Sequence, residues 1–387
     1  MTSKPNAKPA RPWFSSGPTA KRPGWSSQTI PHDLLGRGIR APEVVARFAH
    51  GLKLTRDLLQ VPADWVLVYV PGSDTGAVEA AMWSMLGERP VQVLAFENFG
   101  KVWATDARSH LNLDPEVLSA PWGRFPDVSR VDPAMDLVFP WNGTTSGVKA
   151  PGADWLSADR EGLVICDATS AAFAMRLPFD KLDVVTFSFQ KALGGEAGLG
   201  VAALSPRAVD RLDRFEPPRP IPKVLRLRDD KGFDRLLATG SMLNTFSVWT
   251  IEDWIDGVEW GLSVGGLSEL IARTDANAAA LDRWVSQTPW VEYLAETADI
   301  RSTTSVCLKI VDPRVEAMDD AARRDFVTHM KVLLEAEEAA FDVEGHRNAP
   351  AGLRIWCGCT VDVADIEALT PWLDWAFEMA IVEYSAD

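Results

Sequence analysis

The chain has 387 residues, 47% of them hydrophobic, which is enough for a large core and suggests two domains or one large and one small domain. Its formal net charge of −15 argues against nonspecific nucleic-acid binding and against adhesion to an anionic membrane. No apolar run reaches the length of about 18 residues that predicts a membrane span. Four cysteines, three of them in apolar runs, favour a reduced, cytoplasmic protein without a metal site.

The first part of the chain predicts a tail followed by a large α/β domain. Residues 1–12 are polar and contain prolines, so we expect a disordered tail and not a signal peptide. Apolar runs then alternate with helical stretches up to about residue 250. The expected strands are 66–70, 91–96, 137–141, 163–166, 184–188 and 200–204, and the expected helices are 77–86, 102–111 and 206–214. This alternation predicts a mainly parallel sheet covered by helices on both faces.

A small polar turn, Ser73-Asp74-Thr75, follows the first expected strand and precedes a helical stretch. The free amides at a helix N-terminus form an anion site, to which the two hydroxyls can add donors. Asp74 can cap the helix or face a heteroatom of a cofactor. An isolated turn of this kind is also consistent with a helix cap that binds no ligand.

Two charged residues end later strands of the predicted sheet. Asp167 closes the run 163–166, and Lys191 follows 184–188. A lysine at the end of a buried strand needs a partner, because desolvation disfavours the ammonium form. A Schiff base with pyridoxal phosphate satisfies this need, and an aspartate then pairs with the pyridinium nitrogen. Lys191 alone would more often be an ordinary strand-end lysine, so the prediction depends on its combination with Asp167 and the polar turn.

The pattern changes after residue 217. The proline-rich and charged stretch 217–235 is expected to be a surface connector, and 240–246 an ordered turn. Residues 251–387 are predicted to form a smaller α+β domain, with the large domain spanning 13–250 and its N-terminal segment able to pack on the small one. The remaining expected helices are 248–262, 267–287, 321–341 and 365–383, and the remaining strands are 306–310 and 353–356.

Several motifs resemble the phosphoserine aminotransferase family, which belongs to the class V pyridoxal-phosphate aminotransferases of fold-type I. They are Phe14-Ser15-Ser16-Gly17-Pro18, the run 184–191 and Asn244-Thr245. The runs 73–79, 141–147, 166–172 and 352–356 are similar to a branch found in alphaproteobacteria and some archaea. The resemblance extends from about residue 13 to residue 377.

The resemblance implies a role for each matched position. Lys191 would be the Schiff-base lysine and general base, and Asp167 would hold the pyridinium proton. The other implied cofactor contacts are Trp103 stacking on the ring, Thr144 on the phenolic oxygen, Thr169 and Gln190 on the phosphate, and Ser73, Asp74 and Thr75 in or beside the phosphate cup. Asn244 and Thr245 would reach the phosphate of the neighbouring subunit, which implies an obligate homodimer. Thr144 as a turn residue, Trp103 as a core residue and Asn244 as a helix cap are the simpler alternatives.

The implied substrate contacts are arginines and one histidine. Arg354 would bind the α-carboxylate, and Arg40, His346 and Arg347 would bind a substrate phosphate. The sequence departs from the family at three positions: Ile39 and Leu199 replace common histidines, and Phe246 replaces a common proline. These changes are consistent either with a different acidic substrate or with neutral drift.

The sequence therefore predicts a phosphoserine:2-oxoglutarate aminotransferase that acts by ping-pong transamination in serine biosynthesis. A class V aminotransferase for another acidic 2-oxo acid is the first alternative. A non-catalytic protein that binds the cofactor is the second, but it would not need both Lys191 and Arg354.

Overall fold

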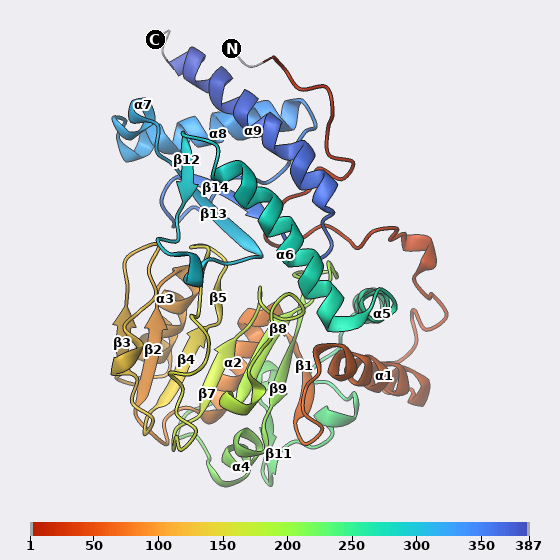
Figure 1. Ribbon diagram of the computed structural model, residues 1–387. Coiled ribbons are helices and arrows are strands. Elements are labelled where there is room, and N and C mark those ends of the chain that lie inside the picture. The colour runs from red at the N-terminus through yellow and green to blue at the C-terminus, as the bar shows by residue number, and fades with distance from the viewer. Residues whose placement is uncertain (1–2, 385–387) are drawn as a thin grey trace.

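The computed structural model describes residues 3–384, and its centre is a seven-stranded sheet (Figure 1). The strand order is β1-β9-β8-β7-β4-β2-β3. The bounds are β1 Val66–Pro71, β2 Val91–Ala95, β3 Glu116–Ser119, β4 Asp136–Pro140, β7 Val164–Asp167, β8 Val184–Ser188 and β9 Leu199–Leu204. Only β9 runs antiparallel to its neighbours, and all other adjacent pairs are parallel. The predicted mainly parallel sheet is confirmed, although β3 was not expected.

Helices cover both faces of this sheet because alternate strand residues point to opposite sides. In β1, Leu67 and Tyr69 pack into one core, and Val68 and Val70 into another. The first core is covered by α1 (Pro42–Leu59), which the sequence analysis did not predict, and α5 (Val248–Ser263). The second is covered by α2 (Ser73–Met85), α3 (Asn98–Thr105) and α4 (Pro206–Arg214).

The small domain contains an antiparallel sheet packed against helices. Its strands, in the order β12-β13-β14, are β12 Val291–Tyr293, β13 Ser305–Ile310 and β14 Gly352–Trp356. Its helices are α7 Pro313–Glu316, α8 Asp320–Ala336 and α9 Val363–Tyr384, together with the second half of α6 Gly266–Val285. Two short sheets pair β5 (Asn142–Gly143) with β6 (Val148–Lys149) and β10 (Arg228–Asp229) with β11 (Gly232–Phe233).

The change from one domain core to the other occurs within α6 and not at residue 250. Trp254 of α5 stacks on Phe189 at 4.3 Å between ring centroids, and its indole N–H donates to Thr55 at 2.9 Å. Leu270 in the first half of α6 lies in the same core, and Leu281 in the second half lies in the core of the small domain. The expected boundary therefore differs from the packing, because α5 buries its apolar face against the large sheet.

The N-terminal segment is held against the small domain. Residues 1–12 were expected to be a disordered tail, but the described part, 3–12, makes specific contacts with α9. The indole of Trp372 donates to the carbonyl of Ala7 at 2.7 Å, and the backbone N–H of Ala10 donates to Asp365 at 2.7 Å. Phe14 then enters the core of the small domain. The segment is held by hydrogen bonds and does not bury an apolar face. Its sequence therefore shows no apolar periodicity, and composition alone suggests disorder.

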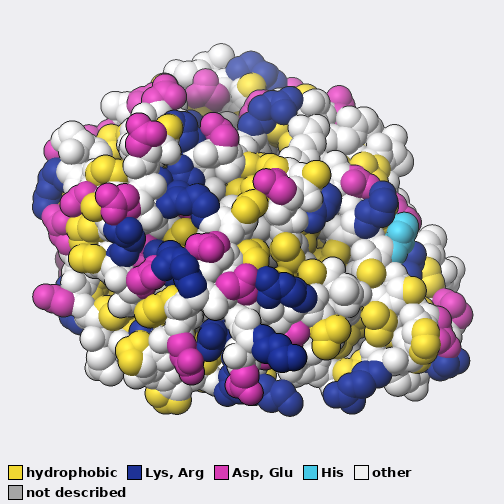
Figure 2. Space-filling view, turned by 90° about the horizontal axis from the view of Figure 1, so that it is seen from below, with side chains coloured by type: hydrophobic (Ala, Val, Ile, Leu, Met, Phe, Trp, Pro, Cys, Tyr) yellow, Lys and Arg dark blue, Asp and Glu magenta, His cyan; other side chains and the backbone are white. Residues whose placement is uncertain are grey.

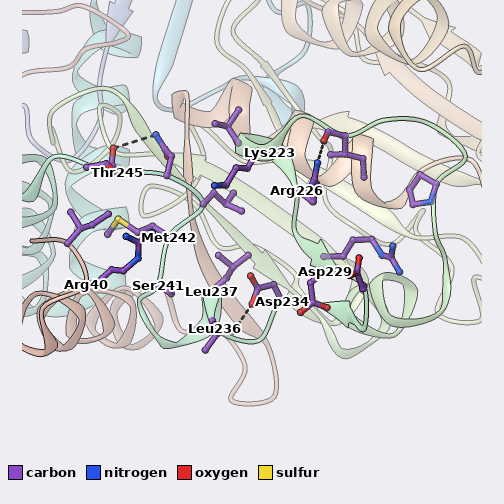
Figure 3. A pocket seen from close by; sticks show the side chains of 18 of the residues that line it. Arg40, Lys223, Arg226, Asp229, Asp234, Leu236, Leu237, Ser241, Met242 and Thr245 are labelled. Atoms are coloured by element: carbon purple, nitrogen blue, oxygen red, sulfur yellow. Dashed lines mark hydrogen bonds between the residues drawn. The ribbon is translucent and has the colours of Figure 1, made fainter.

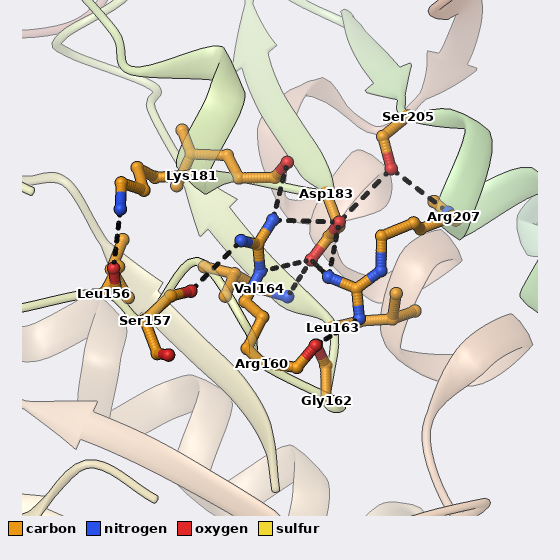
Figure 4. Close-up of polar contacts among 12 residues, drawn as sticks. Leu156, Ser157, Arg160, Gly162, Leu163, Val164, Lys181, Asp183, Ser205 and Arg207 are labelled. Carbon is orange, nitrogen blue, oxygen red and sulfur yellow. Dashed lines mark hydrogen bonds and ion pairs between the residues drawn. The ribbon is translucent and has the colours of Figure 1, made fainter. Parts of the chain in front are cut away.

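A network of ion pairs lies at the amino end of β8, on the side of the large sheet that faces away from the small domain (Figure 4). Asp183 is 1% exposed and accepts hydrogen bonds from Arg160 at 3.1 Å and from the backbone of Val164 at 2.9 Å, with Arg207 at 3.4 Å. A buried carboxylate with this many donors is fully satisfied, which indicates a structural role. Figure 2 shows the surface on this side of the molecule, where basic and acidic side chains are interspersed.

Candidate active site

The carboxyl ends of the parallel strands face the small domain, and Lys191 lies there in the turn after β8 (Figure 1). It is 8% exposed, and its ammonium donates to the carbonyl of Ser16 through a short contact. Burial, followed by the charge of Arg354, lowers the pKa of Lys191 to about 8. Gly17 passes beside the lysine with a φ of 145°, which residues with a side chain rarely adopt, and a Cβ there would lie 2.3 Å from the lysine Nζ.

Two carboxylates share the buried space below this lysine. Asp167 ends β7 and accepts hydrogen bonds from the indole of Trp103 at 3.1 Å and from the backbone N–H of Thr169 at 3.0 Å. Asp74 is 4% exposed, and the polar side chains that face its carboxyl are those of Asp167, Thr169 and Thr186. Burial, followed by the charge of Asp167, raises the pKa of Asp74 well above its ordinary value.

This pair of carboxylates fits pyridoxal phosphate. A buried carboxyl beside a second carboxylate is unfavourable unless a positive charge faces the pair. A protonated pyridine ring supplies that charge. Lys191 lies close enough to Asp167 and Asp74 for their charges to oppose the lowering of its pKa, so the amine and the acids belong to one site.

The predicted phosphate cup lies at the N-terminus of α2. Gly72 precedes the helix with a positive φ of 85°, and no side chain in the described part of the chain caps the first turn, so its amides are available to an anion. The amide of Gln190 donates to the hydroxyl of Ser73 in a short contact, while its own Oε1 is buried and has no partner among residues 3–384. Thr75 is exposed, and Thr169 is half-buried at the end of β7.

Thr144 lies in the loop between β5 and β6 and is buried. Its hydroxyl donates to Ser170 at 2.9 Å, and its carbonyl accepts a hydrogen bond from Ser305 of the small domain at 2.7 Å. The loop is thus fixed between the two domains, next to the strand that ends in Asp167.

The small domain brings two further predicted residues to the site. Arg354 on β14 is half-buried, its Nε has no hydrogen-bond partner among the described residues, and burial lowers its pKa. The pKa of His346 is also lowered. Burial is the largest cause, and the positive charges of Arg354, Arg347 and Lys191 contribute further. The ring of His346 lies 6.4 Å from that of Phe99, which in turn stacks on Trp103. Arg347, beside the histidine, is exposed.

Three predicted site residues are not brought to Lys191 within this chain. Arg40, Asn244 and Thr245 are exposed and line a separate cavity of about 990 Å³ (Figure 3). Ile39, the departure from the family pattern, lines the same cavity.

The sequence analysis missed Glu97, which follows β2 and caps α3. It is fully buried, and its carboxylate accepts hydrogen bonds from the hydroxyl of Thr145 at 2.7 Å and from the backbone N–H of Gly100 at 2.8 Å. Burial raises its pKa to about 7. The available signal was an acidic residue at the carboxyl end of an apolar run, the same kind of position as Asp167.

The comparisons with known proteins agree with this geometry. No family model matches the chain. The phosphoserine aminotransferase of Methanosarcina mazei is 46% identical over 377 residues, which cover 97% of this chain and 99% of that protein. A putative phosphoserine aminotransferase of Mycobacterium sp. strain KMS is 26% identical over 385 residues, 98% of this chain and 99% of that protein.

Solved structures of low sequence identity share the fold. The phosphoserine aminotransferase of Bacillus circulans subsp. alkalophilus has a TM-score of 0.77 at 17% identity, covering 95% of this chain and 98% of that one. An aspartate aminotransferase of Thermus thermophilus has a TM-score of 0.76 at 20% identity, covering 95% and 99%. The fold-type I architecture is therefore confirmed. With a relative 46% identical along nearly its whole length, this chain belongs to the phosphoserine aminotransferase family.

Proposed function

We propose that this protein is a phosphoserine:2-oxoglutarate aminotransferase that uses pyridoxal phosphate. The observation that carries the proposal is the meeting of Lys191, Asp167 and Arg354 at the carboxyl ends of the sheet, in a chain of this family. Glutamate would donate its amino group, and 3-phosphohydroxypyruvate would receive it as phosphoserine. The alternation of the two substrates in one site predicts ping-pong kinetics.

The described residues would hold the cofactor from three sides. When bound, pyridoxal phosphate supplies an aldehyde for exchange of amino groups and a ring that withdraws electrons from the reacting carbon. Lys191 would bind it covalently, and Asp167 would hold the proton on its ring nitrogen. The amides at the start of α2, with Ser73 and Gln190, would bind its phosphate. Trp103, fixed by its hydrogen bond to Asp167, would pack against the ring.

Lys191 would also move the proton of the reacting carbon. A general base must be neutral before it accepts a proton, and a pKa of about 8 leaves an appreciable neutral fraction at slightly alkaline pH. Arg354 would bind the α-carboxylate of either substrate through its planar guanidinium, which has a free Nε. His346 and Arg347 would bind the substrate phosphate from the same chain.

Arg40, Asn244 and Thr245 lie together on one surface, so we infer that all three serve the site of a second subunit. The proposed active form is therefore a homodimer with shared sites. Ile39 lies on this same surface, where the loss of a donor is consistent either with neutral drift or with the alternative, an aminotransferase that acts on another acidic 2-oxo acid.

The test is an assay of the purified protein loaded with pyridoxal phosphate. We expect phosphoserine and 2-oxoglutarate to give glutamate, with phosphoserine preferred over a panel that includes aspartate, alanine and 2-aminoadipate. Faster turnover of another acidic amino acid, with little activity toward phosphoserine, would establish the alternative.

A further inference from the structure

The loop at residues 345–351 carries both of the proposed phosphate ligands that come from the same chain, His346 and Arg347. It has no helix or strand of its own. Its centre is a four-residue turn, in which the backbone N–H of Ala349 donates to the carbonyl of His346 at 2.8 Å. Arg347 and Asn348 occupy the two central positions, so the peptide between them determines the direction of the neighbouring side chains.

That central peptide has two common orientations. Type I and type II turns differ by a flip of this peptide, and the flipped form needs a positive φ at the third residue. Asn348 is one of the few residue types that tolerate a positive φ, so the local sequence does not forbid the flip. In the structure Asn348 has no positive φ, which is the type I orientation. Type I is also the commonest turn and suits most residues, so contacts from outside the turn reinforce an orientation that the backbone already favours.

Arg324 of α8 makes a contact that stabilises this orientation further. Its guanidinium donates to the carbonyl of Arg347 at 3.2 Å and to the carbonyl of Ala349 at 2.9 Å. The first of these carbonyls belongs to the central peptide of the turn. The two-pronged contact is lost if the peptide flips, because the carbonyl then points to the other side.

The same peptide also fixes the imidazole of His346. The backbone N–H of Asn348 donates to Nδ1 of His346 at 3.3 Å. Because Nδ1 accepts, the proton of the neutral ring lies on Nε2, which leaves Nε2 as the donor for an anion. A flip would turn the amide away and release the ring from this orientation.

We propose that Arg324 is a positioning residue for the substrate phosphate, acting through the peptide between Arg347 and Asn348. The proposal rests on the proposed function, since it assigns His346 and Arg347 to the phosphate. Arg324 itself need not touch the substrate. It holds the carbonyl side of the peptide, and the amide side of the same peptide holds the histidine ring.

Three variants of the cofactor-loaded protein test the proposal. Arg324→Met removes the charge and both hydrogen bonds, whereas Arg324→Lys keeps the charge and loses the planar fork. Arg323→Met is the matched control, because Arg323 also donates to two backbone carbonyls, of Met318 at 2.9 Å and of Glu316, at the end of α7 and outside the loop 345–351. We expect KM for phosphoserine to rise about fivefold or more in Arg324→Met with kcat nearly unchanged, as for one lost hydrogen bond. Arg323→Met should leave KM for phosphoserine within about twofold of the wild-type value, which is the usual size of effects between distant, independent sites.

Arg324→Lys separates position from charge. A KM that stays raised in this variant supports positioning, whereas full recovery of the wild-type KM would show that only the charge matters and would overturn the proposal. An unchanged KM in Arg324→Met, or an equal rise in Arg323→Met, would also overturn it.

A second readout does not depend on phosphoserine turnover. The chain has five histidines, so ¹⁵N-histidine labelling gives few imidazole signals, and His346→Gln identifies the one in question. We expect Arg324→Met to shift the Nδ1 resonance of His346 and Arg323→Met to leave it in place. An unshifted resonance refutes the positioning role, whereas a shifted one in a protein that ignores phosphoserine refutes only the proposed function.

Discussion

Asp74 should destabilise the cofactor-free protein, so Asp74→Asn is expected to stabilise it. This carboxyl is buried beside that of Asp167, and burial, together with the charge of Asp167, raises its pKa well above the ordinary value. Each unit by which the folded state raises a carboxyl pKa disfavours the carboxylate by about 1.4 kcal/mol. Asparagine has the same shape and no charge, so the variant should recover the part of the free energy of unfolding that the charge costs.

The gain should depend on pH in a definite direction. The folded state disfavours the carboxylate, so the penalty is absent below the unfolded pKa of about 3.9 and increases as the pH rises toward the raised folded pKa. The variant and the wild type should therefore unfold alike near pH 4 and differ most at alkaline pH. Loss of the Asp74 charge should also lower the pKa of Lys191 further, since that charge opposes the lowering.

Thermal unfolding of the two proteins across this pH range, with and without pyridoxal phosphate, is the assay. With the cofactor bound, the order should reverse, because the carboxylate then faces a cationic ring. Asp183→Asn is the control, and it should lower the free energy of unfolding where Asp74→Asn raises it. Asp183 is paired with Arg160 and Arg207, and breaking a buried pair costs about 3–5 kcal/mol. If Asp74→Asn destabilises the cofactor-free protein at alkaline pH, or acts equally at all pH values, the reasoning is wrong.

The remaining predictions concern the proposed chemistry. Lys191→Ala should remain folded and lose both the covalent cofactor absorbance and all transamination; normal turnover would exclude the assigned role. Asp167→Asn should lose roughly 100-fold or more in rate, since an ionic partner of developing charge is worth a few kcal/mol, and a rate near wild type would point to another residue. Arg40→Ala should raise KM for phosphoserine more than that for glutamate, and Ile39→His should lower it, as measured by steady-state kinetics. If Ile39→His gives no improvement, this position does not limit phosphate recognition.

Much of this protein follows from local sequence. The apolar runs predicted β1, β8 and β9 closely because their residues are buried on both faces, which makes hydrophobicity continuous instead of alternating. Asp167 and Lys191 could be singled out because charged residues rarely end such runs without a partner.

Other features depend on contacts between distant segments. The N-terminal residues look disordered by composition, yet their polar groups bond to α9, and Gly17 passes next to Lys191. The raised pKa of Glu97 and the lowered pKa of Lys191 arise from burial, which no window of sequence reports. Arg324 is an ordinary exposed helical residue in the sequence. Only the tertiary structure places its guanidinium against the turn that orients His346. Every residue has a backbone carbonyl, so the sequence does not indicate which carbonyls an arginine will contact.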